Sequence, residues 1–328
     1  MTNIDIDYIV PMVFPDDPKW RHDLLTATGT YRDDRSAVTN VRYRSWNTEP
    51  ILIDLIRKNL PWLRTIHIIL ARPSQLQPWM KPLLPAAVPE ASASGSPAVR
   101  IVYHADIMPP EVLPTFNSRA IEMYLHNIPG LAPCFLYGND DMFPLAPLPV
   151  TDFFRPAPVP EASASGPIPC LHYTEHPFNP ARPFQVACMN GLNFVATTVA
   201  EASASRTSHF PRRFTDHWLR IGHNVVPILK STCEHFWHHY PRQMAASVTP
   251  FRLPKNFNQY IYSWHQILSG QYIDHRAPRT YLSINTPADA IRNAIRTADG
   301  LLCINDNNSV NDITNIAAIV RSEISHRL

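Results

Sequence analysis

Short apolar runs alternate with amphipathic stretches along the first half of the chain. Four runs have the length and the β-branched content of buried strands: residues 4–10, 65–70, 99–104 and 134–138. Apolar residues at helical spacing lie between them, over residues 49–59 and 117–126. This alternation predicts an α/β fold with a mostly parallel, Rossmann-like (GT-A-like) sheet that is flanked by helices.

The second half of the chain has a different pattern, with many His, Trp and Arg residues between positions 206 and 270. The spacing of apolar residues there predicts helices over residues 225–240 and 256–269. An apolar run at 300–306 predicts a last strand, and residues 310–326 predict a closing helix.

Two parts are therefore expected. Residues 1–155 form an α/β core, and residues 156–328 form a mainly helical half that closes a cleft over the edge of the sheet and packs its final strand and helix on the core. A short repeat containing EASAS occurs at residues 88–95, 159–166 and 201–205. Runs of such small, polar residues cannot build a core, so we expect surface loops without chemistry there.

Composition narrows the classes of partner. The 328 residues carry a net charge of only +2, which gives no overall basic field for nucleic acid. Glycine is scarce, with 9 residues against 34 prolines, and neither a G-x-G-x-x-G nor a G-x-x-x-x-G-K motif occurs. Recognition of an anion must therefore come from a local cluster of side chains.

The cysteines and the apolar runs both indicate the cellular compartment in which the protein resides. The five cysteines, at 134, 170, 188, 233 and 303, form no C-x-x-C pair, which is typical of free thiols in a reducing environment. The first residues do not resemble a signal peptide, and no apolar run has the length of a transmembrane segment. We expect a cytoplasmic protein.

The stretch FLYGNDDMFP (135–144) places two carboxylates directly after a buried strand. Carboxylates rarely enter a core unless they are paired, so Asn139, Asp140 and Asp141 should lie at the end of the strand. Ligands of parallel sheets bind at the carboxyl ends of the strands, where these side chains can meet a cation or an arginine. A solvated turn is the alternative, because Asn and Asp are common turn residues.

Longer blocks around this motif resemble a known family. The block LPTFNSRAIEMYLHNIPGLAPCFLYGNDDMF (113–143) is similar to a block of the Stealth family of sugar-phosphate transferases, which includes bacterial capsular polysaccharide phosphotransferases and the catalytic subunit of the animal GlcNAc-1-phosphotransferase. Further blocks resemble the family in the same order: residues 4–20, 42–71, 222–231, 251–260 and 303–307. Residues 12–15 (MVFP) depart from the usual Trp-Val-Asp/Asn-Gly of the first block.

The resemblance implies a reaction. The family transfers a sugar-1-phosphate from a nucleotide-sugar, here expected to be a UDP-hexose or UDP-HexNAc such as UDP-GlcNAc, to a hydroxyl of an oligosaccharide or polysaccharide acceptor, and UMP leaves. Such a step needs alignment, neutralisation of phosphate charge and a proton acceptor. The resemblance further implies Mg²⁺ (or Mn²⁺), a role in capsule or exopolysaccharide synthesis, and association with the capsule machinery at the inner face of the plasma membrane.

The resemblance also implies the site residues. The residues expected to be catalytic are Ser118, Glu122, Asp141, His223 and Arg252. Those expected to bind substrate are Asn117, Lys230, Asn305 and Asp306, and the metal ligands are Asp140 and Asp141. Arg252 and Lys230 would clamp phosphate, since guanidinium and ammonium groups both suit its oxygens.

Some roles have competing interpretations. Asn117 or Thr115 can cap a helix that carries Ser118 and Glu122 on one face. The alternative is that these two residues have no function, since Ser in a first turn and Glu on an exposed face are common in helices. His223 can accept the acceptor's proton because the imidazole pKa lies near neutrality, but Asp141 or Glu122 can serve instead.

Other side chains have simpler explanations. His235 and His239 lie four residues apart, as in helical zinc sites, but no third ligand is evident in the sequence. Tyr260 and Trp264 can stack on a base or sugar, although core packing is the commoner role of such residues.

Two alternative functions use the same features. A metal-dependent nucleotide-sugar glycosyltransferase would hold its metal at a similar acidic strand end but would release UDP. A non-catalytic glycan-binding relative would keep the fold and lose turnover, and the altered residues 12–15 leave this interpretation open.

Overall fold

The computed structural model describes residues 4–30, 40–84, 96–156, 166–202, 210–306 and 312–328. Most of the EASAS repeats lie outside these described residues. The helices are α1 (Pro18–Thr30), α2 (Glu49–Asn59), α3 (His104–Ile107), α4 (Ser118–Glu122), α5 (Pro183–Ala202), α6 (Lys230–His239), α7 (Pro241–Ala246), α8 (Tyr260–Leu268), α9 (Ala288–Thr297) and α10 (Thr314–Ser325). The strands are β1 (Ile6–Pro11), β2 (Thr65–Leu70), β3 (Ala98–Tyr103), β4 (Cys134–Tyr137), β5 (Met142–Pro144), β6 (Phe154–Arg155), β7 (Ile168–Leu171), β8 (Tyr173–Pro177), β9 (His217–Ile221), β10 (Val226–Leu229), β11 (Ile273–Asp274), β12 (Arg279–Ser283) and β13 (Leu301–Asn305).

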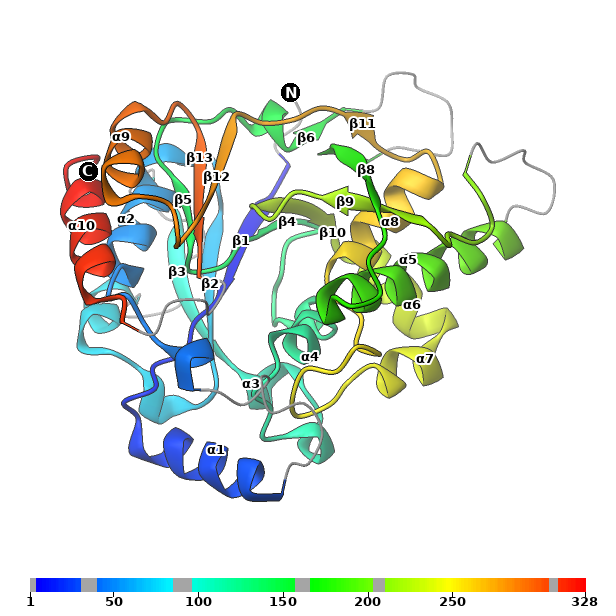
Figure 1. The fold of residues 1–328 in the computed structure, drawn as a ribbon, viewed down its shortest axis with the longest axis horizontal. Helices are drawn as coiled ribbons and strands as arrows, with labels where there is room; N and C mark the ends of the chain where they lie inside the picture. The colour runs from blue at the N-terminus through cyan, green and yellow to red at the C-terminus, as the bar shows by residue number, and fades with distance from the viewer. Residues whose placement is uncertain (1–3, 31–39, 85–95, 157–165, 203–209, 307–311) are drawn as a thin grey trace.

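A five-stranded sheet forms the centre of the molecule, in the order β10-β4-β1-β2-β3 (Figure 1). Strands β4, β1, β2 and β3 are parallel, and β10 runs antiparallel to β4 at one edge. The predicted α/β fold with a mostly parallel, Rossmann-like sheet is confirmed. Because β4 returns to the opposite side of β1 from β2, the strand order reverses between β1 and β4, which is where such sheets bind ligands.

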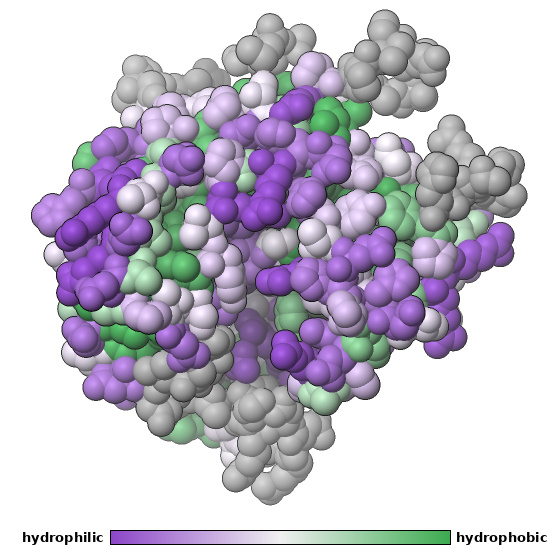
Figure 2. Space-filling view, turned by 45° about the horizontal axis from the view of Figure 1, so that its top comes forward, coloured by the Kyte–Doolittle hydropathy of each residue, from purple (hydrophilic) through white to green (hydrophobic). Residues whose placement is uncertain are grey.

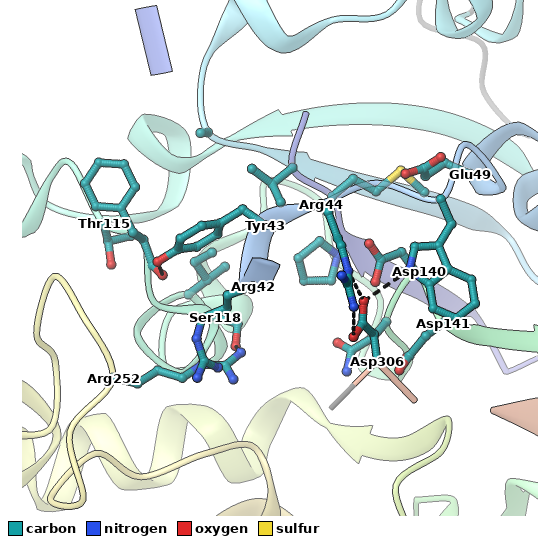
Figure 3. A pocket seen from close by; sticks show the side chains of 18 of the residues that line it. Arg42, Tyr43, Arg44, Glu49, Thr115, Ser118, Asp140, Asp141, Arg252 and Asp306 are labelled. Carbon is teal, nitrogen blue, oxygen red and sulfur yellow. Dashed lines mark hydrogen bonds and ion pairs between the residues drawn. The ribbon is translucent and has the colours of Figure 1, made fainter. Parts of the chain in front are cut away.

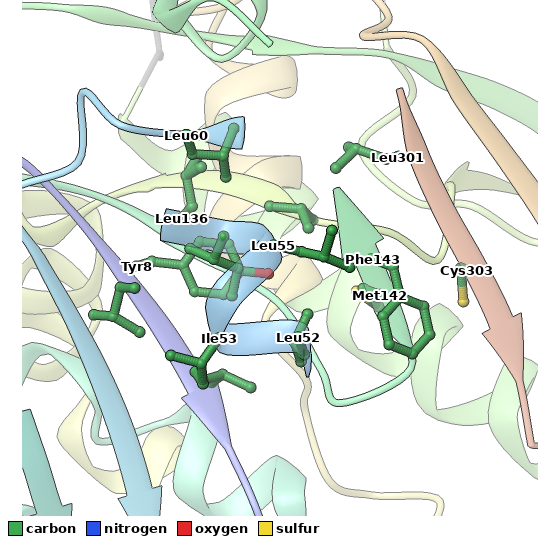
Figure 4. Close-up of a cluster of buried hydrophobic side chains, with 14 of the residues drawn as sticks. Tyr8, Leu52, Ile53, Leu55, Leu60, Leu136, Met142, Phe143, Leu301 and Cys303 are labelled. Atoms are coloured by element: carbon green, nitrogen blue, oxygen red, sulfur yellow. The ribbon is translucent and has the colours of Figure 1, made fainter. Parts of the chain in front are cut away.

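Helices cover both faces of this sheet, so its strands are apolar on both sides. On one face, the fully buried Tyr8 and Val10 of β1 share a core cluster with Leu52 and Ile56 of α2. Figure 4 shows Tyr8 and Leu52 in this cluster. On the other face, Ile9 joins residues of α5, α6 and α8. The alternation along β1 therefore assigns successive side chains to two different cores.

Helix α2 spans the predicted residues because its sequence fits a helix that is buried along one side. Pro50 lies in its first turn, where a missing N–H does no harm, and Pro61 follows its end. The side chain of Asn59 donates a hydrogen bond to the carbonyl of Pro144 at 2.7 Å. This bond ties the end of α2 to β5, directly beyond the GNDD turn.

The single helix predicted over residues 225–240 is wrong. Residues Val226–Leu229 form β10, and only Lys230–His239 are helical. Pro227 explains the difference, since it would break a helix interior but is tolerated in an edge strand. Strand β10 is such an edge, because it pairs with β4 alone among the described strands.

The helix predicted over residues 117–126 is also too long. Helix α4 ends at Glu122, and a 3₁₀ turn follows at Leu125–Asn127. Pro129 comes next, and the residue before a proline avoids the helical conformation. Similarly, α8 begins at Tyr260 rather than 256, because the Asn256 carboxamide bonds to the main chain of Leu253 and Ser247 and holds a loop.

Strand β13 confirms the predicted last strand, and it pairs with β12 and β5 in a small sheet next to α2. Helix α10 confirms the closing helix within the described residues and packs against α9 (Figure 1). Thus the second half contributes strands to the core as well as helices beside it.

Figure 2 shows one face of the molecule, where hydrophobic residues are scattered among hydrophilic ones and a recess with hydrophilic side chains opens near the middle. Among the helices in the described part of the chain, none combines the length and apolar character needed to cross a bilayer.

Candidate active site

A cavity of about 270 Å³ lies at the carboxyl ends of β1 and β4. Residues from segments far apart in the sequence line it, including the ends of β1, β4 and β13 and the segment before β10. Seven of the predicted site residues meet there: Ser118, Asp140, Asp141, His223, Arg252, Asn305 and Asp306. The cavity therefore lies at the strand ends where a ligand site was predicted.

The GNDD turn depends on Gly138. A Cβ at this position would lie 2.1 Å from the hydroxyl oxygen of Tyr8 and 2.9 Å from the ring carbon that carries it. The Gly138 N–H donates to the carbonyl of Ile9 at 3.0 Å, which holds the turn against β1. Close approach of the backbone to Tyr8 thus requires glycine and directs Asp140 and Asp141 toward the cavity (Figure 3).

One end of the cavity is acidic. Asp140 lies near three further carboxylates, those of Asp141, Glu49 and Asp306. Burial, followed by the charge of these neighbours, raises the pKa of Asp140 to about 8. An arrangement of carboxylates that raises a pKa in this way also favours a bound cation, which relieves the repulsion.

Arg44 compensates part of this charge. Its Nε and Nη2 donate to the two carboxylate oxygens of Asp306 at 2.6 and 2.7 Å, and the indole N–H of Trp46 donates to the same carboxylate at 3.3 Å (Figure 3). Asp306 therefore joins β13 to the segment that follows the 3₁₀ turn Asn40–Tyr43. This ion pair forms one wall of the cavity.

Asp141 is only partly satisfied by hydrogen bonds. Its Oδ2 accepts from the side chain of Asn305 at 3.2 Å and lies 3.5 Å from Nε2 of His223. Its Oδ1 is buried and has no hydrogen-bond partner among the described residues. A buried carboxylate oxygen without a donor, beside other carboxylates, fits a divalent cation such as Mg²⁺ or Mn²⁺.

The other end of the cavity is cationic. Nη2 of Arg252 donates to the hydroxyl of Ser118 at 2.7 Å, while its Nε is buried without a partner among the described residues. Arg42 lies beside them in Figure 3. Arg119 is buried behind this end, and burial together with the charge of Arg252 lowers its pKa to about 10. Converging guanidinium groups of this kind suit an anion such as a phosphate.

Asn117 holds this end together and does not line the cavity. Its Oδ1 accepts from the N–H of Arg119 as the cap of α4, so the predicted cap is confirmed. Its Nδ2 lies within hydrogen-bonding distance of the carbonyls of Thr249 and Phe251 and of the Asn256 carboxamide. Asn117 therefore fixes the loop of Arg252 relative to Ser118, which is a positioning role.

Two more predicted site residues lie away from the cavity. Glu122 is buried and accepts hydrogen bonds from the hydroxyl of Tyr137 and the N–H of Gln259, and burial raises its pKa. Lys230 lies 3.6 Å from Glu234 at the start of α6. Because β10 is antiparallel to β4, Lys230 follows the end of β10 that is opposite to the cavity. The structure thus separates Lys230 from the phosphate end.

The structure gives Tyr260 and Trp264 the core-packing role, the commoner of the two expected for them. Tyr260 and Trp264 are buried in the core. His235 and His239 have adjacent rings, but they belong to no group of three potential metal ligands among the described residues.

Cys303, whose pKa is raised by burial, lies beside Asp141. All five cysteines are buried free thiols, as predicted.

Several cavity residues were not singled out from the sequence. Arg42 and Arg44 alternate in RYRSW, at the start of the block of residues 42–71 that resembles the family, and their spacing around Tyr43 was the signal available. Tyr43 packs edge-on against Trp20, which also packs against Phe116. These rings form a small core of their own beneath the cationic end. His104, at the end of β3, was also missed, since nothing local distinguishes it.

Comparisons with known proteins agree with this geometry. The family model described as Stealth protein CR2, conserved region 2, matches residues 42–162. This region contains Arg42, Arg44, Ser118 and the GNDD turn.

Two curated proteins match over most of the chain, and a third matches about half of it. The capsular polysaccharide phosphotransferase LcbA of Aeromonas hydrophila is 28% identical, over 99% of this chain and 86% of that protein. The capsular polysaccharide phosphotransferase WcwK of Streptococcus pneumoniae is 25% identical, over 94% and 92% respectively. The exopolysaccharide phosphotransferase cps2G of Lactiplantibacillus plantarum is 34% identical over 49% of this chain and 42% of its own length.

Proposed function

Because this chain belongs to the Stealth family, we propose that it is a phosphotransferase that moves a sugar-1-phosphate from a nucleotide-sugar to a hydroxyl of an acceptor glycan, in capsular or exopolysaccharide synthesis. The observation that carries the proposal is the cavity with opposite charges at its two ends. A diphosphate donor presents oxygens that suit both an arginine cluster and a cation held by carboxylates. The names of the relatives, which are capsular and exopolysaccharide phosphotransferases, support the same reaction class.

In this proposal, the cationic end binds the diphosphate. Arg252, whose Nε has no partner among the described residues, and Arg42 offer planar sets of N–H donors to the phosphate oxygens. Ser118 donates its hydroxyl proton to phosphate while it accepts from Arg252. The hydrogen bond between Arg252 and Ser118 holds these two donors in place before substrate arrives. Such preorganised groups stabilise the charge of a phosphoryl transition state.

The acidic end would hold the divalent cation. Asp141 and Asp140 are the ligands proposed for Mg²⁺ or Mn²⁺, and Asn305 orients Asp141. When bound, such an ion neutralises phosphate charge. Asp306, one of the substrate ligands expected from the sequence, is instead assigned to the wall that it forms with Arg44.

His223 is the proposed general base. Its Nε2 faces Asp141 at 3.5 Å, and its side chain is 28% exposed, so a hydroxyl entering the cavity can reach it. The acceptor oxygen attacks the phosphorus that bears the donor sugar, and the bond from this phosphorus to the bridging diphosphate oxygen breaks. The hydroxyl proton passes to His223, and UMP leaves with the bridging oxygen. Asp141 stabilises the imidazolium that forms.

The same proposal places the reaction in the cytoplasm at the inner face of the plasma membrane, with a UDP-hexose or UDP-HexNAc as donor and a growing oligosaccharide as acceptor. Incubation with a panel of UDP-sugars, acceptor glycans and Mg²⁺ or Mn²⁺ tests it, with the released nucleotide as the measurement. UMP together with a phosphodiester-linked product is expected. Release of UDP would instead identify a glycosyltransferase, and binding without any turnover would identify a glycan-binding relative.

A further inference from the structure

Cys303 lies against the acidic end of the cavity and has no part in the proposed reaction. It lies in β13 opposite Met142 of β5, next to the GNDD turn, and its side chain is buried. One ligand atom from each of Asp141, His223 and Cys303 lies within 4.8 Å of the others. Within the described parts of the chain, these three residues form the one group with such a spacing.

The separations suit a small tetrahedral ion. Typical bond lengths of zinc to nitrogen and oxygen place two such ligands about 3.4 Å apart in a tetrahedron. The distance between Nε2 of His223 and Oδ2 of Asp141 is 3.5 Å. The exposed fractions of these two side chains, 28% and 16%, leave them open to an ion in the cavity. The His223–Asp141 pair therefore already has the separation that such an ion requires, and the Cys303 ligand atom lies within 4.8 Å of a ligand atom of each.

The ligand types argue against Mg²⁺ at these three atoms. Mg²⁺ requires oxygen ligands in an octahedron and retains its water, whereas thiolate and imidazole select zinc-like ions. Zn²⁺ accepts Cys sulfur, His nitrogen and Asp oxygen as ligands, and catalytic zinc sites combine three protein ligands with an open fourth position. The site that shares Asp141 with the proposed magnesium site therefore has a different selectivity.

We infer that Asp141, His223 and Cys303 form a binding site for a thiophilic divalent cation, of the class of Zn²⁺, Cd²⁺ and Co²⁺, that inhibits the enzyme. Inhibition rests on the proposed function, whereas binding does not. As the metal–sulfur bond forms, the Cys303 thiol releases its proton to solvent. The bound ion occupies Nε2 of His223, which then cannot accept the proton of an acceptor hydroxyl, and it withdraws Asp141 from Mg²⁺.

Titration of the metal-free protein with Co²⁺ tests binding directly. A thiolate bound to Co²⁺ gives a charge-transfer absorption band, and tetrahedral coordination gives strong visible bands. The wild-type protein should show both at one equivalent, and excess Mg²⁺ should not produce them. Cys303→Ser should lose the thiolate band, whereas Cys233→Ser, which removes a buried thiol of α6 that belongs to no group of three potential metal ligands among the described residues, should keep it.

A second variant covers the case in which Cys303→Ser does not fold. His223→Gln alters a partly exposed side chain and should keep the fold. Loss of a residue that merely supports a metal ligand weakens metal binding by roughly 10- to 100-fold. Because His223 is itself a ligand here, the His223→Gln change should weaken Co²⁺ binding by at least as much. Equal Co²⁺ affinity in His223→Gln and wild type, or a wild-type protein without a thiolate band, would overturn the inference.

Inhibition is measured separately. Zn²⁺ should inhibit transfer in Mg²⁺ by wild type, and Cys303→Ser should need at least about tenfold more Zn²⁺ for half-inhibition, relative to its own uninhibited rate. Equal Zn²⁺ sensitivity of the two proteins would reject the inhibitory role. If the thiolate band appears but no UDP-sugar is turned over, the proposed function fails and the metal site stands.

Discussion

His223 and Asp141 face each other in the cavity, with Nε2 of the imidazole 3.5 Å from Oδ2 of the carboxylate. Asp141 follows β4 and His223 precedes β10, and these two strands are antiparallel neighbours. Pairing of β4 with β10 therefore brings the two side chains together at one edge of the sheet. The pair links the proposed metal end to the proposed base.

Asp141→Asn is expected to abolish transfer and its dependence on Mg²⁺ or Mn²⁺. The amide keeps the shape and can still bond to Asn305, so the fold should persist. Loss of the charge should reduce the rate by at least about 10²-fold, as for removal of one group that stabilises the transition state. Rates at varied metal concentration, with circular dichroism as the control for folding, provide the measurement. Unchanged turnover would rule out the assignment.

Arg252→Lys should lose most activity even though the positive charge remains. The guanidinium reaches Ser118 with one nitrogen and keeps others for phosphate, and an ammonium group cannot reproduce this fork. We expect a decrease of about 10²- to 10³-fold in kcat/KM.

Lys230→Met is the matched control for a lost cation, because Lys230 lies outside the cavity lining. Its activity should stay close to that of wild type in the same assay. A larger loss for Lys230→Met than for Arg252→Lys would contradict the placement of the phosphate end.

Gly138→Ala should destabilise the GNDD turn, because the new methyl group would overlap the hydroxyl of Tyr8. The cost is expected to be about 1–3 kcal/mol in the free energy of unfolding. Tyr8→Phe removes a buried hydroxyl that has no hydrogen-bond partner among the described residues, so this change alone should cost little. Combining the two should relieve part of the overlap, since the ring carbon remains close. A double-mutant cycle in urea tests this, and strictly additive effects would contradict the close approach.

His104 should make the protein less stable in acid. Burial, and next the charge of Arg72, lower the pKa of His104 to about 4, whereas the pKa in the unfolded chain is about 6.5. Between these values the unfolded state binds more protons, so the free energy of unfolding falls as the pH decreases from about 6.5 to about 4. This one group accounts for at most about 3 kcal/mol.

The variant His104→Gln should remove that part of the acid dependence, as measured by urea unfolding at pH values across this range. His22→Gln, at an exposed position of α1, is the control and should leave the slope unchanged. Equal slopes for His104→Gln and wild type would show that the imidazole is not held neutral.

Local sequence patterns were sufficient to predict most strands of the central sheet and helix α2. The spacing of apolar residues located β2 and α2 at their observed bounds and β1, β3 and β4 to within two residues. The sequence also indicated that Asp140 and Asp141 lie at the end of a strand. Burial along a strand or helix imposes its own period on the sequence, so these features can be recognised without knowledge of the neighbours.

The sequence by itself thus determined the class of fold and the position of the acidic turn. Only the tertiary structure decided which side chains share the cavity, because sheet order and strand direction depend on contacts between distant segments. His223 and Lys230 show this most clearly, since they lie seven positions apart in the sequence yet at opposite ends of β10. The extended strand between them runs antiparallel to β4, from the carboxyl end of β4 to its amino end. His223 therefore lies in the cavity, and Lys230 lies at the opposite end of the strands.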